Sequence, residues 1–150
     1  MTAPSIGPDV ANYFEARGWA IAEVRADVLS TPVLGQHGEW TAFAKMREQE
    51  QQVVFHSVFP TRVPARRRKE VAMFLTRANF GLVIGNFELD LDDGELRYKT
   101  SIDVEDAELT DALIDHLVLA NVTTMDRYLP GIEAVIAGAK ADEAIHEIED

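Results

Sequence analysis

The chain has 150 residues, of which 47% are hydrophobic and 27% are charged, and its formal net charge is −12. This length and composition suit one globular domain with its own hydrophobic core and exclude an intrinsically disordered chain. Cysteine is absent, which excludes disulfide bonds, thiolate nucleophiles and metal sites built on cysteine.

No hydrophobic run approaches the roughly 20 residues that a membrane-spanning helix needs. Residues 1–8 contain neither a basic residue nor an apolar block, so they lack the pattern of a secretory signal or a transit peptide. These two observations predict a cytoplasmic protein without a membrane partner.

The negative charge is concentrated in the last third of the chain. Residues 1–102 contain 13 acidic and 12 basic side chains, whereas residues 103–150 contain 13 acidic and only 2 basic ones. A surface of this sign repels the phosphates of nucleic acids and of anionic lipids. We therefore expect no nucleic-acid partner, and the complement of the C-terminal part would be basic.

The chain begins with a helix pattern and continues with a strand pattern. Residues 8–17 place apolar side chains on one side of a short helix, which Gly18 is expected to end. Residues 22–28 alternate between apolar and charged side chains, as in a strand with one solvated face. The breakers at residues 30–32 are expected to end that strand.

Two antiparallel hairpins are predicted further along the chain. Residues 40–46 alternate between apolar and polar side chains, and residues 53–59 return as an apolar-rich run after a polar turn. Residues 86–91 and 96–102 alternate in the same way around an aspartate-glycine turn, which predicts the second hairpin.

Two longer apolar patterns predict helices. In residues 64–78 apolar side chains recur at intervals of three and four, and Gly81 stops the pattern. A wider stripe begins near residue 106 or 110 and covers one face of a long helix. This helix is expected to kink or restart at Pro130 and to continue to Gly138.

This order of elements, helix, three strands, helix, two strands and helix, predicts the α+β class. We expect an antiparallel sheet of about five strands with helices packed mainly on one face, because hairpins cannot supply the crossovers of a parallel sheet. Residues 1–150 are expected to form a single domain, with its core at about residues 8–138 and an acidic tail at residues 139–150.

Three stretches carry a resemblance to a known family. They are RKEVAMFLTRAN at residues 68–79, the segment from Gly85 to Gly94, and MDRYLP at residues 125–130. They resemble the YbjN family, also described as sensory-transduction regulators, over about residues 10–138. The resemblance implies a fold similar to type III secretion chaperones, which bind proteins through surfaces. It implies a noncatalytic domain for protein contact and supplies no active-site residues.

Five basic residues cluster around the start of the second predicted helix: Arg62, Arg66, Arg67, Arg68 and Lys69. Positive charges at a helix N-terminus oppose the helix dipole. One interpretation is a solvated cluster whose aliphatic stems cover the sheet. The other, which makes the cluster a candidate protein-contact site, is that it meets the acidic C-terminal helix or tail, within one chain or across a dimer. Nucleic-acid binding is disfavoured because no aromatic residues alternate with the bases.

The acidic turn of the second hairpin has a possible metal-binding interpretation. Asp90, Asp92, Asp93 and Gly94 are reminiscent of a calcium loop, but such a loop would need oxygen ligands at positions 89, 91 and 93, and leucines occupy the first two of these. The pattern favours a hairpin turn.

The remaining polar residues do not form a recognisable chemical site. None of the four histidines has a partner at zinc-ligand spacing, although Asp142, His146 and Asp150 would share one face of a helical tail. His56 is interpreted as a half-buried strand residue, not as a general base. The glycines and serines match no nucleotide loop or nucleophile elbow. We expect no catalytic residue, no metal and no cofactor.

The sequence therefore favours a non-enzymatic protein-binding or regulatory domain that forms a homodimer and contacts a protein whose identity the sequence does not specify. Two alternatives remain open. A small-ligand sensor would need an apolar pocket between the long C-terminal helix and the sheet. An enzyme would need convergent polar groups in that pocket, with strongly shifted pKa values.

Overall fold

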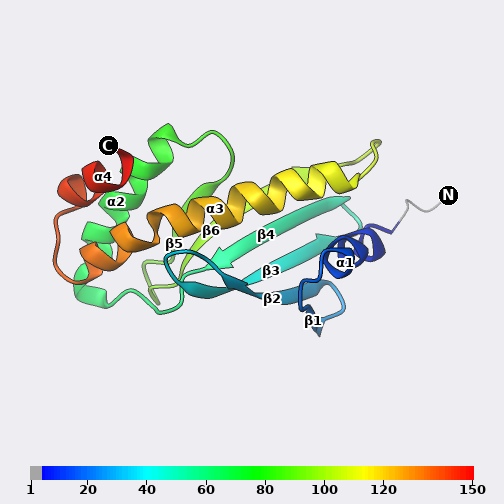
Figure 1. The fold of residues 1–150 in the computed structure, drawn as a ribbon, viewed down its shortest axis with the longest axis horizontal. Coiled ribbons are helices and arrows are strands. Elements are labelled where there is room, and N and C mark those ends of the chain that lie inside the picture. The colour runs from blue at the N-terminus through cyan, green and yellow to red at the C-terminus, as the bar shows by residue number, and fades with distance from the viewer. Residues whose placement is uncertain (1–4) are drawn as a thin grey trace.

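A computed structural model describes residues 5–150 (Figure 1). Within these residues the elements are, in chain order, α1 (Gly7–Ala16), β1 (Ala22–Arg25), β2 (Val28–Leu34), β3 (Glu39–Arg47), β4 (Gln52–Val58), the 3₁₀ helix η1 (Ala65–Arg67), α2 (Arg68–Gly81), β5 (Asn86–Leu89), β6 (Leu96–Asp103), α3 (Asp111–Ile136) and α4 (Ala141–Glu149). The strands form one antiparallel sheet in the order β1-β2-β3-β4-β6-β5.

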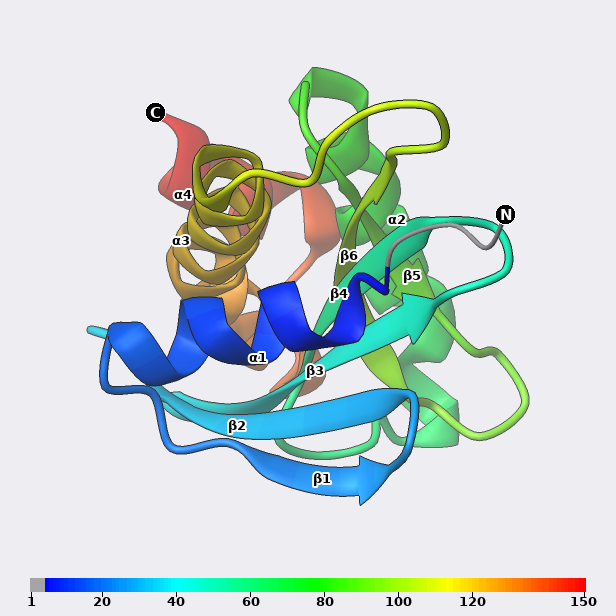
Figure 2. The ribbon, with the colours of Figure 1, turned by 90° about the vertical axis from the view of Figure 1, so that its right-hand side faces the viewer.

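The helices gather over one side of this sheet. α1 and α3 lie over its inner face, and α2 and α4 pack beside the C-terminal half of α3 (Figure 1, Figure 2). The predicted α+β class, with an antiparallel sheet and helices mainly on one face, is confirmed.

The sheet has six strands where the sequence predicted about five, because residues 22–34 form two strands. The chain reverses between Arg25 and Val28. The prediction that a strand ends just before Pro32 is wrong, since Pro32 lies inside β2. β1 pairs with β2 only as far as Ser30. Pro32 therefore lies where β2 has a single neighbouring strand, and an edge position tolerates a residue without an N–H group.

The core lies between the helices and the inner face of the sheet. The inward side chains of β3 are all buried, as their alternation predicted: Trp40, Ala42, Ala44 and Met46. The apolar positions of α2 are buried as well: Val71, Phe74, Leu75 and Ala78. The alternation of apolar residues in β3 and their spacing of three and four in α2 therefore identified the buried face of each element correctly.

α3 is one continuous helix that does not restart at Pro130. A proline at this position leaves the carbonyl of Asp126 without its helical donor. His37, in the loop between β2 and β3, donates to that carbonyl from Nδ1 at 3.1 Å. The backbone N–H of His37 donates to Asp126 Oδ1 at 2.9 Å. The proline thus provides the point at which this loop docks on the helix.

A buried asparagine fixes α3 on the sheet. Asn121 is fully buried, and its Nδ2 lies 2.9 Å from the carbonyl of Phe55, 3.0 Å from that of Tyr98 and 3.1 Å from Thr100 Oγ1. The hydroxyl of Thr100 donates to the carbonyl of Leu117 at 2.9 Å. Because buried polar groups need partners, this network favours one position of α3 along β4 and β6.

The last residues form a packed helix. α4 buries Ala141, Ala144 and Ile145 against α2 and α3, so the hydrophobic core continues past residue 138. Among residues 5–150, no helix combines the length and the apolar character that crossing a membrane requires.

Candidate functional site

The structure divides the five clustered bases into two groups. Arg62, Arg67 and Arg68 are bound by groups of the same chain. Arg66 and Lys69 are exposed, and their side chains make no hydrogen bond or ion pair within residues 5–150. Only the second group is therefore free to contact another molecule.

Arg67 explains why a base stands at the start of α2. Its guanidinium donates to the carbonyl of Val135 at 2.8 Å and to that of Ala139 at 2.9 Å. The last carbonyls of a helix lack helical partners and carry the negative end of its dipole, so Arg67 stabilises the end of α3. One turn further, Glu70 accepts from the backbone N–H of Ala141 at 2.7 Å. The first turn of α2 thus holds both sides of the junction between α3 and α4.

Arg68 and Arg62 hold the turn between β5 and β6. Arg68 donates to the carbonyls of Leu91 at 3.3 Å and Asp92 at 3.1 Å, and Arg62 forms an ion pair with Asp93. The predicted hairpin turn is confirmed by the antiparallel pairing of β5 with β6. Nowhere in residues 5–150 do three or more histidine, aspartate or glutamate side chains converge as a metal site would require.

The outer face of α2 and η1 forms an exposed stripe, of which the sequence pattern identified only two members. We define the α2 stripe by five residues: Arg66, Lys69, Met73, Arg77 and Phe80. Met73 is 54% exposed and Phe80 is 96% exposed. None of the three bases forms an ion pair with another residue of the described chain.

The loop that follows α2 extends this apolar surface. Val83 is 91% exposed and Ile84 is 57% exposed. A hollow of about 440 Å³ lies between α2 and α4 and is lined partly by Phe80 and Ile145. Large apolar side chains that share one exposed patch mark a contact surface. The apolar run at residues 82–84, which lies between Gly81 and Gly85 and follows Phe80, was the available sequence signal.

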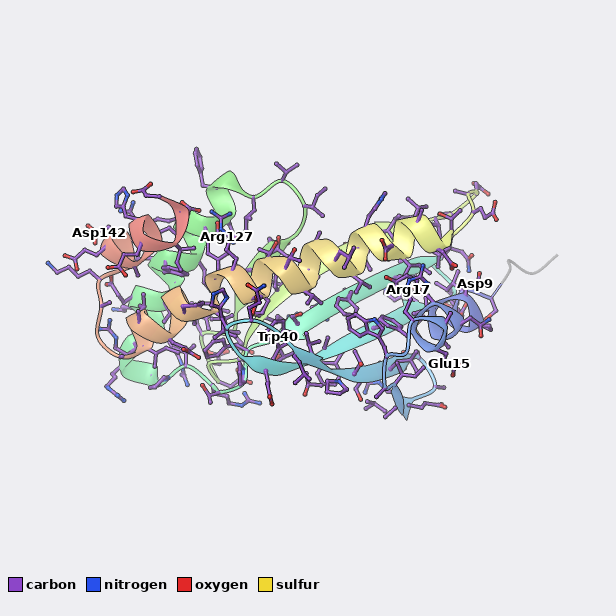
Figure 3. All side chains as sticks on the ribbon, in the orientation of Figure 1. Asp9, Glu15, Arg17, Trp40, Arg127 and Asp142 are labelled. Atoms are coloured by element: carbon purple, nitrogen blue, oxygen red, sulfur yellow. The ribbon has the colours of Figure 1, made fainter. Side chains whose placement is uncertain are left out.

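α4 presents a surface of the opposite charge beside the α2 stripe. Asp142, Glu143 and Glu147 are exposed and form no ion pair within residues 5–150. Figure 3 shows Asp142 at the end of the molecule opposite Asp9, which lies on α1. We call Asp142, Glu143 and Glu147 the α4 acidic face.

A second candidate surface lies on the outer face of the sheet. A hollow of about 570 Å³ is lined by strand residues and Glu95, and by no helix residue. Five bases line it: Arg25, Lys45, Arg47, Arg97 and Lys99. Four apolar side chains form its floor: Val28, Phe43, Val54 and Val58. This basic hollow is unexpected in a chain with a net charge of −12.

His56 lies in the centre of the basic hollow. The pKa of His56 is lowered from 6.5 to about 4, first by burial and then by the positive charge of Arg97; Lys99 and Lys45 lower it as well, and Glu88 raises it. A neutral His56 forms no ion pair with Glu88, whose Oε1 lies 3.9 Å from its Nε2. His56 is thus a half-buried strand residue, as its position between apolar neighbours predicted.

Glu88 of β5 joins the two bases of β6 that line this surface. Its carboxylate accepts from Arg97 at 2.8 Å and from Lys99 at 3.0 Å. Burial alone would raise the pKa of Glu88, but these hydrogen bonds outweigh burial and lower it. Glu88 is therefore ionised and fully engaged at neutral pH, which leaves it poorly suited to proton transfer.

Comparison with known proteins gives a family and a fold. The model of the YbjN family, described as "Putative bacterial sensory transduction regulator", matches residues 9–134. The chain is also similar to the crystal structure of YbjN from E. coli, described as "a putative transcription regulator", with a TM-score of 0.64 and 14% sequence identity. That alignment covers 98% of this chain and 97% of the other. A search of curated proteins gives no match.

Proposed function

Because the chain belongs to the YbjN family, we propose that it is a non-enzymatic, cytoplasmic regulator that acts by binding other proteins. The observation that carries this proposal is the α2 stripe with its neighbouring loop. Phe80 and Val83 are more than nine-tenths exposed, although burying such a side chain stabilises a protein by about 1.5–3 kcal/mol. A partner surface would supply that burial.

The first partner in this proposal is a second copy of the chain. The α2 stripe carries three bases without ion pairs, and the α4 acidic face carries three acids without ion pairs, all within the described residues. α2 and α4 are neighbours in one molecule. A two-fold axis between two such pairs would place each α2 stripe against the α4 acidic face of the other copy, as an isologous interface requires.

The alternative of a small-ligand sensor finds less support in the packing. It requires a pocket between α3 and the sheet, where Leu117, Val118 and Met125 are buried side chains. Asn121 spans the same interface with hydrogen bonds to both β4 and β6. The space that a ligand would occupy is filled by this packing.

The proposed dimer is tested by reversing the charge of the α2 stripe. We expect the wild-type chain to sediment as a dimer and the triple variant Arg66→Glu, Lys69→Glu, Arg77→Glu to sediment as a monomer at ~100 µM, because three attractive contacts become repulsive. Analytical ultracentrifugation measures this directly, and circular dichroism verifies that the variant is folded.

The matched control reverses three bases elsewhere on the surface, in Arg25→Glu, Arg47→Glu and Arg127→Glu. These residues lie outside the α2 stripe, so the control should remain a dimer despite an equal change in net charge. A monomeric wild-type chain, or a stripe variant that stays dimeric, would refute the proposed interface.

A further inference from the structure

We propose that the basic hollow on the outer sheet face binds an acidic amphipathic α-helix of a partner protein. This inference rests on the proposed protein-binding function and names the chemistry of a partner segment. It does not depend on the dimer, because the hollow is built from strands and shares no residue with the α2 stripe.

The size and shape of the surface favour a polypeptide over a small molecule. The lining residues come from β1, β2, β3, β4 and β6, and strands spaced about 4.8 Å apart make such a hollow about 19 Å wide. Two smaller hollows on the same face adjoin it, and they share Arg47 and Arg97 with it, respectively. A small ligand is usually enclosed in a deep pocket, whereas this surface is open and elongated.

The hydrogen bonding of the sheet decides the conformation of the occupant. β3, β4 and β6 form the floor of the hollow, and each of them is paired on both sides. An added strand would find no free donors or acceptors there. The occupant must therefore satisfy its own backbone groups, and an α-helix does so within one segment.

The apolar floor and the bases together specify an amphipathic, acidic helix. Lys45 lies opposite Val28 on one side and Val54 on the other, and it forms no ion pair within residues 5–150. Arg97 and Lys99 share the carboxylate of Glu88, and Arg97 also lies 4.0 Å from the carboxylate of Glu95. Lys45, on the middle strand of the hollow, therefore gives it an excess of positive charge, which a flanking carboxylate of the helix would neutralise.

The bases at the rim contribute less to this excess. Arg25 pairs with Asp27 at 3.4 Å, and Arg47 pairs with Glu50 at 3.3 Å. Exposed pairs of this kind contribute little binding energy. The discriminating residue is therefore Lys45, whose side chain forms no hydrogen bond or ion pair within residues 5–150.

The experiment uses two synthetic helical peptides of about 18 residues, or five turns, each with leucine at intervals of three and four. One carries glutamate beside the leucine stripe and the other carries lysine at the same positions. The probe is added to the full-length, isotope-labelled protein, and backbone amide signals are followed by NMR. We expect the acidic peptide to shift signals of β3, β4 and β6, and its affinity to fall at least threefold between about 50 mM and about 300 mM salt.

The variant Lys45→Glu should weaken binding of the acidic peptide about tenfold, which corresponds to 1.4 kcal/mol. The control Lys140→Glu makes the same charge change at the start of α4 and should leave the affinity unchanged. Absence of binding, equal binding of the lysine peptide, or signal shifts confined to α2 and α4 would overturn the inference. Sedimentation of the same samples measures the oligomeric state, so a failure of peptide binding is distinguished from a failure of the proposed dimer.

Discussion

Neighbouring bases of one cluster have different roles in this protein. Arg67 binds the carbonyls at the end of α3, whereas Arg66 is exposed and has no side-chain partner in the described chain. The apparent conflict between basic residues and the start of α2 disappears for Arg67, because its guanidinium serves the C-terminus of another helix. Sequence spacing alone cannot distinguish these two side chains.

We expect Arg67→Met to lower the free energy of unfolding by about 1–3 kcal/mol, because two partly buried carbonyls lose hydrogen bonds from a charged donor. Arg66→Met should change it by less than about 0.5 kcal/mol. Urea denaturation in dilute solution measures both values without a contribution from association. Equal effects of the two substitutions would show that the contacts of Arg67 do not stabilise the junction.

His56 makes stability depend on pH. Its pKa is lowered from 6.5 to about 4 in the folded chain, by burial first and by Arg97 second. The unfolded chain binds the proton more readily, so the native state loses stability as the pH falls from about 6.5 to about 4. The loss at pH 4.5 is about 2.5 kcal/mol, since each unit of pKa difference corresponds to 1.36 kcal/mol.

The test is urea denaturation of the wild type and of His56→Gln at several pH values. The variant should lose less stability over this interval, because glutamine does not titrate. Both proteins retain the neighbouring charged residues Glu88, Lys45, Arg97 and Lys99. The contribution of these residues to the pH dependence of stability therefore cancels to first order. Identical pH profiles would mean that His56 is protonated as easily in the folded chain as in the unfolded one.

At the scale of elements, α3 determines how the helices sit on the sheet. Asn121 donates into both β4 and β6. Asn121→Leu would remove these hydrogen bonds and place an apolar side chain against the same polar groups, and it should cost about 1–3 kcal/mol. Asn121→Asp would bring a carboxylate against the same carbonyls and should cost more, about 3–5 kcal/mol.

Thermal or urea unfolding measures this order of stability. Thr123→Ala is the control on the same helix, because Thr123 is exposed and its hydroxyl bonds only to the carbonyl of Leu119 in its own helix. It should be nearly neutral. An Asn121→Asp variant as stable as Asn121→Leu would contradict the proposed orientation of the amide.

Helices and strands with one buried face could be predicted from the sequence. The strands at the β1 edge of the sheet could not. α2 and β3 follow their apolar periodicity, because one side of each meets the core. β1 also alternates, but all four of its residues are exposed, so the alternation there does not report burial. Pro32 misled the prediction because only the pairing of β2 shows that this position has one neighbour.

The candidate surfaces were harder to predict than the fold. Arg66 and Lys69 were identified through their charge, but Arg77 and Phe80 join them only because a helix brings residues three and four apart onto one face. The basic hollow combines residues from five strands, and no short sequence motif contains them. The residues of a contact surface are selected by exposure, which requires the folded chain.

At the scale of the whole molecule, the fold separates two surfaces. The helical end of the molecule presents the α2 stripe beside the α4 acidic face, and the outer sheet face presents the basic hollow. Acidic residues from the last third of the chain therefore lie on α4, the helix that packs against α2 and its basic stripe. This arrangement is the physical basis of our proposal that the chain associates with itself and with a partner protein through different faces.

The most direct test of this account is a charge exchange between two variants. One variant carries Arg66→Glu, Lys69→Glu and Arg77→Glu, and the other carries Asp142→Lys, Glu143→Lys and Glu147→Lys. Each variant alone should sediment as a monomer. In an equimolar mixture the two variants should form a mixed dimer. At one contact the acidic stripe of the first variant meets the basic α4 face of the second. At the other contact the wild-type α2 stripe meets the wild-type α4 acidic face. A mixture that remains monomeric while the wild type is dimeric would contradict the central claim that these two surfaces meet.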